Sequence, residues 1–218
     1  MVDFSLPRES IETVAGPLSE EQAVLLTAYG QAILRASREI NVVSRRSLGS
    51  LGEHFVDSAA MLSFADPYQG SVGDLGSGAG FPGVVVAIMR PEASITLVDS
   101  RRSKIVFLKD VKRRLGLDNV TVVHGRLEEL PGHMQFGLVV ARALGRTKAV
   151  LASCLRLVAP GGELILFKGP LWGDEIEGAR VIAAQEGAEI VRTRRITLPG
   201  LDRATTFVAF HVKPTMDE

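Results

Sequence analysis

The sequence predicts an α/β fold: a mostly parallel β-sheet with helices on both faces and a C-terminal antiparallel hairpin, preceded by N-terminal helices. Three observations predict it. From residue 70 onward, short apolar runs alternate with helical segments, a pattern typical of right-handed β–α–β units. The last two apolar runs, 188–197 and 205–212, are separated by a segment too short for a helix, so they should pair as antiparallel neighbours. Before residue 66 the apolar spacing is helical.

The N-terminal segment should therefore be distinct from the sheet-forming part. We expect residues 1–66 to form a helical extension packed on the core, and residues 67–218 to form the α/β domain. Ser19 and Gln22 have the spacing of a capping box, and the helix that they begin should run to about Arg38.

The segment 102–115 shows how the helices of the α/β domain should pack. Ile105, Leu108 and Val111 recur at helical spacing and give one buried face, with the basic residues of the segment outside it. The remaining elements follow from the same alternation of apolar runs and helical spacing. The expected strands are 72–75, 95–98, 120–123, 138–140 and 164–167, and the other expected helices are 51–64, 83–89, 147–158 and 173–185.

Composition excludes several classes of protein. The chain has 46% hydrophobic and 23% charged residues, which is ordinary for a globular protein. It has one cysteine, Cys154, and no Cys/His cluster with zinc spacing, so neither a disulfide scaffold nor a metal site is expected. No apolar run approaches the ~18 residues of a membrane span, and residues 1–10 do not resemble a signal peptide. We expect a soluble cytoplasmic protein with no membrane partner.

The charge is balanced overall but unevenly distributed. Lys+Arg and Asp+Glu both number 25, so the excess of positive charge that is typical of nucleic-acid-binding domains is absent. Residues 101–114 are nevertheless strongly basic, and a local basic patch can still attract a polyanion.

A glycine-rich loop directly after the first expected strand carries the main functional signal. It reads Asp74-Leu-Gly-Ser-Gly-Ala-Gly-Phe-Pro-Gly83, and its alternating glycines let the backbone approach a ligand closely. Two cofactor patterns fit. Read from Gly78, the loop matches the dinucleotide fingerprint G-x-G-x-x-G. Read from Asp74, it matches acid-x-G-x-G-x-G, the pattern associated with S-adenosylmethionine.

The pattern that starts at Asp74 fits better. A carboxylate at that strand end could receive the α-ammonium group of S-adenosylmethionine, directly or through water, whereas a pyrophosphate would gain nothing from it. Asp99 closes the second strand and can accept both ribose hydroxyls, which either cofactor requires. Leu127 and Glu128 follow the third strand, where this fold places the adenine ring.

Several separated motifs match one family in the same order. They are Asn41 with Ser44, His54-Phe-Val-Asp-Ser58, the loop 74–83, Leu97-Val-Asp-Ser100, Arg126-Leu-Glu128, Ala141-Arg-Ala143 and Phe167-Lys-Gly169. The chain resembles the bacterial 16S ribosomal RNA guanine-N7 methyltransferases, the RsmG (GidB) family. The resemblance implies a class I S-adenosylmethionine-dependent methyltransferase fold, with S-adenosyl-L-homocysteine as product. It also implies that the acceptor is one guanine of 16S rRNA, in the small ribosomal subunit or an assembly intermediate.

The resemblance also assigns residues. It implies cofactor contacts at Gly76 and Phe81 in the loop, at Leu127 and Glu128, and at Arg142 after the fourth strand, beside the contacts expected for Asp74, Gly78 and Asp99. Arg101 and Arg102 follow Asp99-Ser100 where the family commonly has smaller or single basic residues.

The expected chemistry needs no general base. Guanine N7 carries a lone pair and no proton, so catalysis should consist of holding N7 in line with the methyl group. We expect Arg142 to assist by binding the methionine carboxylate or an RNA phosphate, and Cys154 to be a packing residue. The candidates for RNA contact are His54, Lys168, Arg101, Arg102 and Lys104, with His54 and Asp57 alternatively anchoring the N-terminal helices.

Three other functions stay open from the sequence. The same cofactor could serve a protein or small-molecule acceptor. The loop read from Gly78 could bind NAD in an oxidoreductase, or it could be purely structural in a non-catalytic RNA-binding module.

Overall fold

The computed structural model describes residues 4–40, 42–44, 48–65, 70–169, 172–199 and 204–214. Three helices precede the sheet in the described part: α1 (Arg8–Ala15), α2 (Glu20–Ala36) and α4 (Leu51–Ala65). The capping box at the start of α2 is confirmed, because the Ser19 hydroxyl accepts from the Gln22 N–H at 3.1 Å and the Gln22 side chain accepts from the Ser19 N–H at 3.0 Å.

Strands and helices then alternate as expected. The elements are β1 (Ser71–Leu75), α5 (Gly83–Met89), β2 (Ser94–Asp99), α6 (Arg102–Leu115), β3 (Val120–His124), the short 3-10 turn η1 (Leu127–Glu129), β4 (Phe136–Arg142), α7 (Thr147–Leu155), β5 (Val158–Lys168), α8 (Trp172–Gln185), β6 (Ala188–Thr197) and β7 (Ala204–Val212). Most boundaries lie within two residues of expectation, and two differ by more. The helix predicted to reach residue 158 ends at Leu155, and β5 starts at Val158, six residues before its predicted start at 164.

The seven strands form one sheet in the order β3-β2-β1-β4-β5-β7-β6. Strands β1 to β5 pair in parallel, while β7 is antiparallel to both β5 and β6. The predicted C-terminal hairpin is confirmed. Its second strand, β7, pairs with β5 and lies inside the sheet, whereas β6 is the edge strand. A reason is visible in the side chains: Phe207 to Phe210 of β7 are all buried, as expected of a strand covered on both faces, whereas β6 carries exposed arginines suited to an edge.

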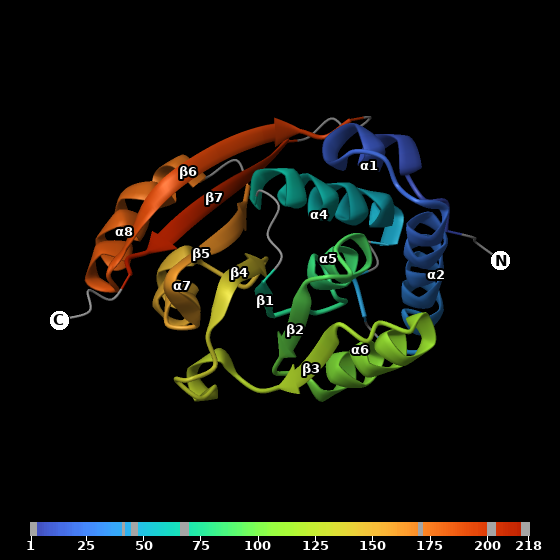
Figure 1. The fold of residues 1–218 in the computed structure, drawn as a ribbon, viewed down its shortest axis with the longest axis horizontal. Coiled ribbons are helices and arrows are strands. Elements are labelled where there is room, and N and C mark those ends of the chain that lie inside the picture. Colours follow the sequence, from blue (N-terminus) through green and yellow to red (C-terminus); the bar gives the residue numbers. More distant parts are fainter. Residues whose placement is uncertain are drawn as a thin grey trace.

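Helices cover both faces of the sheet, and alternate residues of each strand determine which face they meet (Figure 1). Leu138 and Val140 of β4 pack in the core cluster of α2, α4, α5 and α6. Val139 and Ala141 of the same strand pack in the cluster of α7 and α8. Arg142 continues the first alternation, so its side chain projects toward α4.

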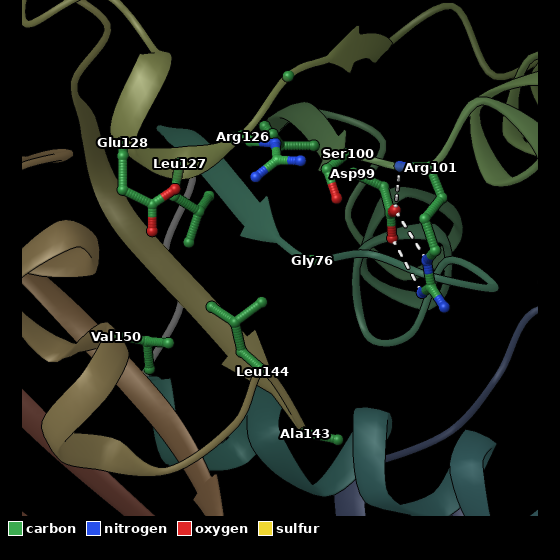
Figure 2. A pocket seen from close by; sticks show the side chains of 12 residues that line it. Gly76, Asp99, Ser100, Arg101, Arg126, Leu127, Glu128, Ala143, Leu144 and Val150 are labelled. Carbon is green, nitrogen blue, oxygen red and sulfur yellow. Dashed lines mark hydrogen bonds and ion pairs between the residues drawn. The ribbon is translucent and has the colours of Figure 1, made fainter.

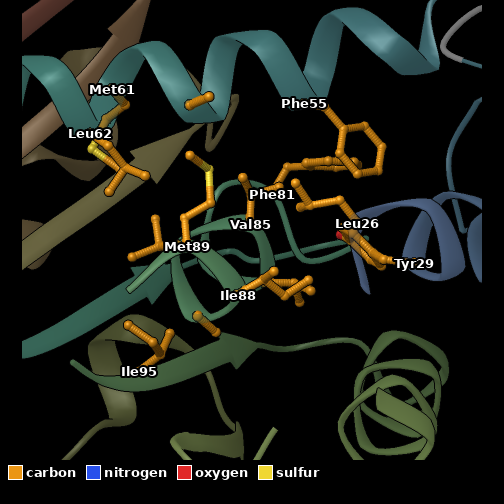
Figure 3. Packing of buried hydrophobic residues seen from close by; sticks show 14 of the residues in the cluster. Leu26, Tyr29, Phe55, Met61, Leu62, Phe81, Val85, Ile88, Met89 and Ile95 are labelled. Carbon is orange, nitrogen blue, oxygen red and sulfur yellow. The ribbon is translucent and has the colours of Figure 1, made fainter. Parts of the chain in front are cut away.

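The N-terminal helices share their core with the sheet. Tyr29 and Ile33 of α2, Phe55 of α4 and Val85 of α5 belong to one continuous buried cluster that reaches Ile95 on β2 (Figure 3). The predicted buried face of α6 is confirmed by Ile105, Leu108 and Val111. The expectation that all basic residues lie outside that face is wrong for Lys104, which is 5% exposed and donates to the Val42 carbonyl.

Candidate cofactor and substrate site

A cavity of about 460 Å³ opens where the parallel strands β1 to β4 end (Figure 2). Ligands of open α/β sheets bind at this edge, because the loops after adjacent strands converge there. We call it the strand-end cavity. Its lining consists of Gly76, Val98, Asp99, Ser100, Arg101, Gly125, Arg126, Leu127, Glu128, Ala143, Leu144 and Val150.

The structure brings together some of the expected cofactor residues at this cavity. Gly76, Asp99, Leu127 and Glu128 lie on its wall, although they come from three separate segments. Asp74, Gly78, Phe81 and Arg142 are not part of the lining. Sequence reasoning missed Leu144 and Val150, whose apolar character alone did not distinguish them from core residues.

Gly76 allows the glycine-rich loop to pass close to the side chain of Leu144, which follows β4. Its φ is +70°, a conformation that favours glycine, and a Cβ built there would lie 2.2 Å from Leu144 Cδ1. Leu144, which is labelled in Figure 2, also lines the cavity and packs against this loop. A side chain at position 76 would therefore displace part of the wall.

The carboxylate of Asp99 is the charged group at the centre of the cavity wall. Its Oδ2 accepts from the Gly78 N–H at 2.9 Å and its Oδ1 accepts from the Arg101 N–H at 2.8 Å. The Arg101 guanidinium lies over the same two oxygens, at 3.3 Å and 3.4 Å. Burial would raise the pKa of Asp99, but these hydrogen bonds outweigh it and hold the pKa below its usual value.

Asp74 lies beneath the glycine-rich loop and is fully buried. Its Oδ2 accepts from the Gly83 N–H at 3.0 Å, which ties the end of the loop to β1. Its Oδ1 has no hydrogen-bond partner among the described residues. Burial raises the pKa of this carboxyl group to about 7, although the Gly83 hydrogen bond acts in the opposite direction.

The N-terminal helices support the loop from the side away from the cavity. Phe81 packs against the rings of Tyr29 and Phe55, with centroid distances of 5.2 and 5.1 Å (Figure 3). The His54 ring lies 5.4 Å from Phe81. The fully buried Tyr29 donates its hydroxyl to the Ala79 carbonyl at 2.7 Å. Sequence analysis did not single out Tyr29, because one tyrosine on the apolar face of a helix gives no signal beyond packing.

Arg142 forms a buried polar cluster with the N-terminal part of the chain. Its Nη2 lies 3.0 Å from Asp57 Oδ2 and 2.5 Å from His54 Nδ1, both on α4. Thr205 on β7 donates to the other oxygen of Asp57 at 2.5 Å. The side chains of Arg142 and Asp57 are 16% and 2% exposed. Among the described residues, Arg142 thus joins β4 to α4, and His54 and Asp57 join α4 to the sheet.

The loop after β3 forms the opposite side of the cavity. Leu127 is 8% exposed and Glu128 is exposed. The carbonyl oxygen of Leu127 accepts from Arg156 Nη2 at 2.6 Å, which fixes the turn. Cys154 lies in the core behind it, and burial raises the pKa of its thiol to about 12, as suits a packing residue and not a nucleophile.

The expected RNA contacts differ in accessibility. Arg101 and Arg102 are exposed, whereas Lys104 is buried and so does not present its ammonium group at the surface. Lys168 is 11% exposed on its side chain and forms a 2.9 Å ion pair with Glu175. Asn41, which with Ser44 is one of the motifs of the family resemblance, lies outside the described residues.

Within the described ranges no group of three His, Cys, Asp or Glu side chains could hold a metal ion. The same ranges contain no helix with the length and apolar character needed to cross a membrane.

Comparisons with known proteins agree with this architecture. A family model described as "rRNA small subunit methyltransferase G" (GidB) matches residues 22–198. A protein of that name from Lactobacillus delbrueckii subsp. bulgaricus is 34% identical over 202 residues, covering 88% of this chain and 82% of its own. One from Thermobifida fusca is 32% identical over 220 residues, covering 100% of this chain and 90% of its own.

Solved structures with much lower identity share the fold. The glycopeptide N-methyltransferase MtfA complexed with S-adenosyl-L-methionine superposes with a TM-score of 0.59 at 13% identity, covering 74% of this chain and 94% of that one. A 16S rRNA (adenine(1408)-N(1))-methyltransferase from Catenulisporales acidiphilia gives a TM-score of 0.56 at 16% identity, covering 76% and 92%. The predicted class I methyltransferase fold is confirmed.

Proposed function

The chain belongs to the rRNA small subunit methyltransferase G (GidB) family, and we infer from this membership that it methylates N7 of a guanine in 16S rRNA. S-adenosyl-L-methionine is the methyl donor and S-adenosyl-L-homocysteine the product. The structural observation that best supports this function is the strand-end cavity, in which the carboxylate of Asp99 at the end of β2 lies beside a glycine-rich loop.

The cavity has groups that match the parts of such a donor. We propose that Asp99 accepts the ribose hydroxyls and that Leu127 and Glu128 contact the adenine ring, since these residues line adjacent parts of the wall. Gly76 lies on the same wall, where the absence of a side chain lets the loop pack directly against Leu144. The orphaned oxygen of Asp74 is a candidate acceptor for the α-ammonium group, beneath the same loop.

We propose that the residues around the cavity act by positioning the guanine, because the reaction itself needs no general base. When bound, the donor supplies an activated methyl group, and guanine N7 offers a lone pair without a proton. Orientation can then provide most of the rate enhancement, up to about 7–11 kcal/mol in favourable cases. The described residues fit this chemistry, because Cys154 is buried and His54 is bonded to Arg142. We propose that Arg142 positions the site through the α4 contact.

RNA would reach the cavity along its exposed basic rim. Arg101 and Arg126 line the cavity with side chains 63% and 73% exposed, and Arg102 follows at the surface. We propose that these three arginines contact phosphate groups, so RNA affinity should fall steeply with salt. His54 and Lys168 are weaker candidates, because both already have protein partners. The acceptor would be the small ribosomal subunit or an assembly intermediate in the cytoplasm, with no metal required.

Methyl transfer to free 16S rRNA and to purified small subunits, followed by mapping of the modified nucleoside, tests this function. We expect 7-methylguanosine at a single position. Methylation of a protein or small molecule with no label in rRNA would instead support the same donor with another acceptor.

A further inference from the structure

Asp99 and Arg101 are paired inside the strand-end cavity, on the carboxylate proposed to bind the ribose. Figure 2 shows the guanidinium of Arg101 turned back onto Asp99. Arg101 Nε lies 3.3 Å from Oδ1 and Nη2 lies 3.4 Å from Oδ2. The Asp99 side chain is 3% exposed, whereas the Arg101 side chain is 63% exposed.

These contacts fill the hydrogen-bonding capacity of the carboxylate. An ionised carboxylate offers about four lone-pair positions. Two are taken by the backbone N–H groups of Gly78 and Arg101, and two by the guanidinium of Arg101. Two ribose hydroxyls that donate to Asp99 therefore need positions that are already in use.

Ribose hydroxyls can replace the two guanidinium donors of Arg101 at lower cost than the two backbone N–H donors. The Gly78 N–H belongs to the glycine-rich loop and the Arg101 N–H immediately precedes α6, so both are held by the backbone. The guanidinium is at the end of a flexible, exposed side chain, and its contacts with Asp99 are the longer ones. Because the Arg101 side chain is exposed, water can solvate the released guanidinium, so its ion pair with Asp99 should be weak.

We propose that Arg101 is an internal competitor for the ribose-binding carboxylate, which cofactor hydroxyls must displace, and that it thereby lowers the affinity of this chain for its cofactor. The inference rests on the proposed function, because it requires a ribose at Asp99. Until it is displaced, the guanidinium keeps the carboxylate ionised and paired, consistent with the lowered pKa of Asp99. Displacement would also free the guanidinium at the cavity rim.

Calorimetric titration with S-adenosyl-L-homocysteine tests the proposal on Arg101→Gln. The dissociation constant should fall about two- to fivefold, because the weak ion pair no longer has to be broken. Arg113→Gln is the matched control. It removes the same charge and another Arg–Asp contact (2.7 Å to Asp110), within the helix that follows Arg101 and outside the cavity, and should leave the dissociation constant unchanged.

A second ligand distinguishes competition for the hydroxyl site from a general charge effect. The 2′,3′-dideoxy analogue of S-adenosyl-L-homocysteine cannot donate to Asp99, so wild type and Arg101→Gln should bind it equally. Weaker binding of S-adenosyl-L-homocysteine by Arg101→Gln, or an equal gain for both ligands, would overturn the role of Arg101 alone. If folded wild type bound no S-adenosyl-L-homocysteine, the proposed cofactor site would be refuted, and this inference with it.

Discussion

The hydroxyl group of Tyr29 donates a 2.7 Å hydrogen bond to the carbonyl oxygen of Ala79, so α2 holds the glycine-rich loop from outside the sheet. Both partners are buried, with Tyr29 fully so. The N-terminal helices are thus connected to the segment proposed to bind the cofactor. Substitutions in α2 that break this hydrogen bond should therefore change the position of the glycine-rich loop.

Tyr29→Phe should weaken cofactor binding more than its effect on folding explains. Losing one buried hydrogen bond should lower the free energy of unfolding by about 1–3 kcal/mol and let the loop shift. We expect a several-fold weaker affinity for S-adenosyl-L-homocysteine, measured by calorimetry. Ile33→Val in the same helix, a fully buried position, should cost about 0.5–1.5 kcal/mol of stability without changing that affinity. Equal effects of the two variants on affinity would show that the hydroxyl has no role in positioning the loop.

A comparison of Gly76→Ala with Gly116→Ala distinguishes the effect of a steric clash in the cavity wall from the effect of backbone strain alone. Both glycines have positive φ, +70° and +63°, so both substitutions should destabilise the fold by about 1 kcal/mol or more. A Cβ at position 76 would clash with Leu144, whereas one at position 116 meets nothing within 4 Å. Cofactor affinity should therefore fall at least tenfold in Gly76→Ala only. Unchanged affinity in that variant would place the ligand away from this loop.

Because Arg142 and Asp57 form an ion pair, substitutions of the two residues should have non-additive effects on the free energy of unfolding. Arg142→Ala leaves a buried carboxylate without the guanidinium and should destabilise the protein by about 3–5 kcal/mol. Adding Asp57→Asn removes the buried charge and should restore part of the stability. We expect methyl transfer to stay reduced by orders of magnitude in both. Recovery of transfer together with stability would assign Arg142 a purely structural role.

Asp74 predicts a pH dependence of stability. Its pKa is about 7 in the folded protein against an ordinary value of 3.8, so between these values the folded state binds a proton that the unfolded state does not. Stability from this group is complete below pH 3.8, falls as pH rises to about 7, and is constant above that. The rise of the pKa from 3.8 to about 7 corresponds to roughly 4 kcal/mol. Urea unfolding of wild type and Asp74→Asn between pH 4 and 8 should show the variant gaining relative stability with pH. A pH-independent difference would mean that Asp74 titrates normally.

Local patterns were sufficient to predict much of the fold. The alternation of short apolar runs predicted the parallel strands, and Ser19 and Gln22 predicted the start of a helix. The position of β7 between β5 and β6 in the sheet was not predicted. The sequence did carry a signal for it, because β7 has a continuous apolar run at 207–210 whereas β6 has several arginines. The early start of β5 was missed because Pro160-Gly-Gly162 reads locally as a turn.

Asp99 and Leu127-Glu128, named from their places after expected strands, do line the strand-end cavity, and their cofactor contacts stay a prediction. Contacts between segments far apart in the sequence could not be predicted, because the local sequence around one residue does not identify its partner. Arg142 and Asp57 are 85 residues apart, and Lys104 is buried because its side chain meets Val42, 62 residues away. Helical spacing fixes the direction of a side chain on its own helix but not what another segment places against it.

A crystal structure with bound S-adenosyl-L-homocysteine tests the central claim most directly. The account predicts the ligand in the strand-end cavity, with its ribose hydroxyls within hydrogen-bonding distance of Asp99, its adenine against Leu127, and the Arg101 guanidinium moved off the carboxylate. A ligand bound elsewhere, or one whose ribose does not reach Asp99, would contradict it.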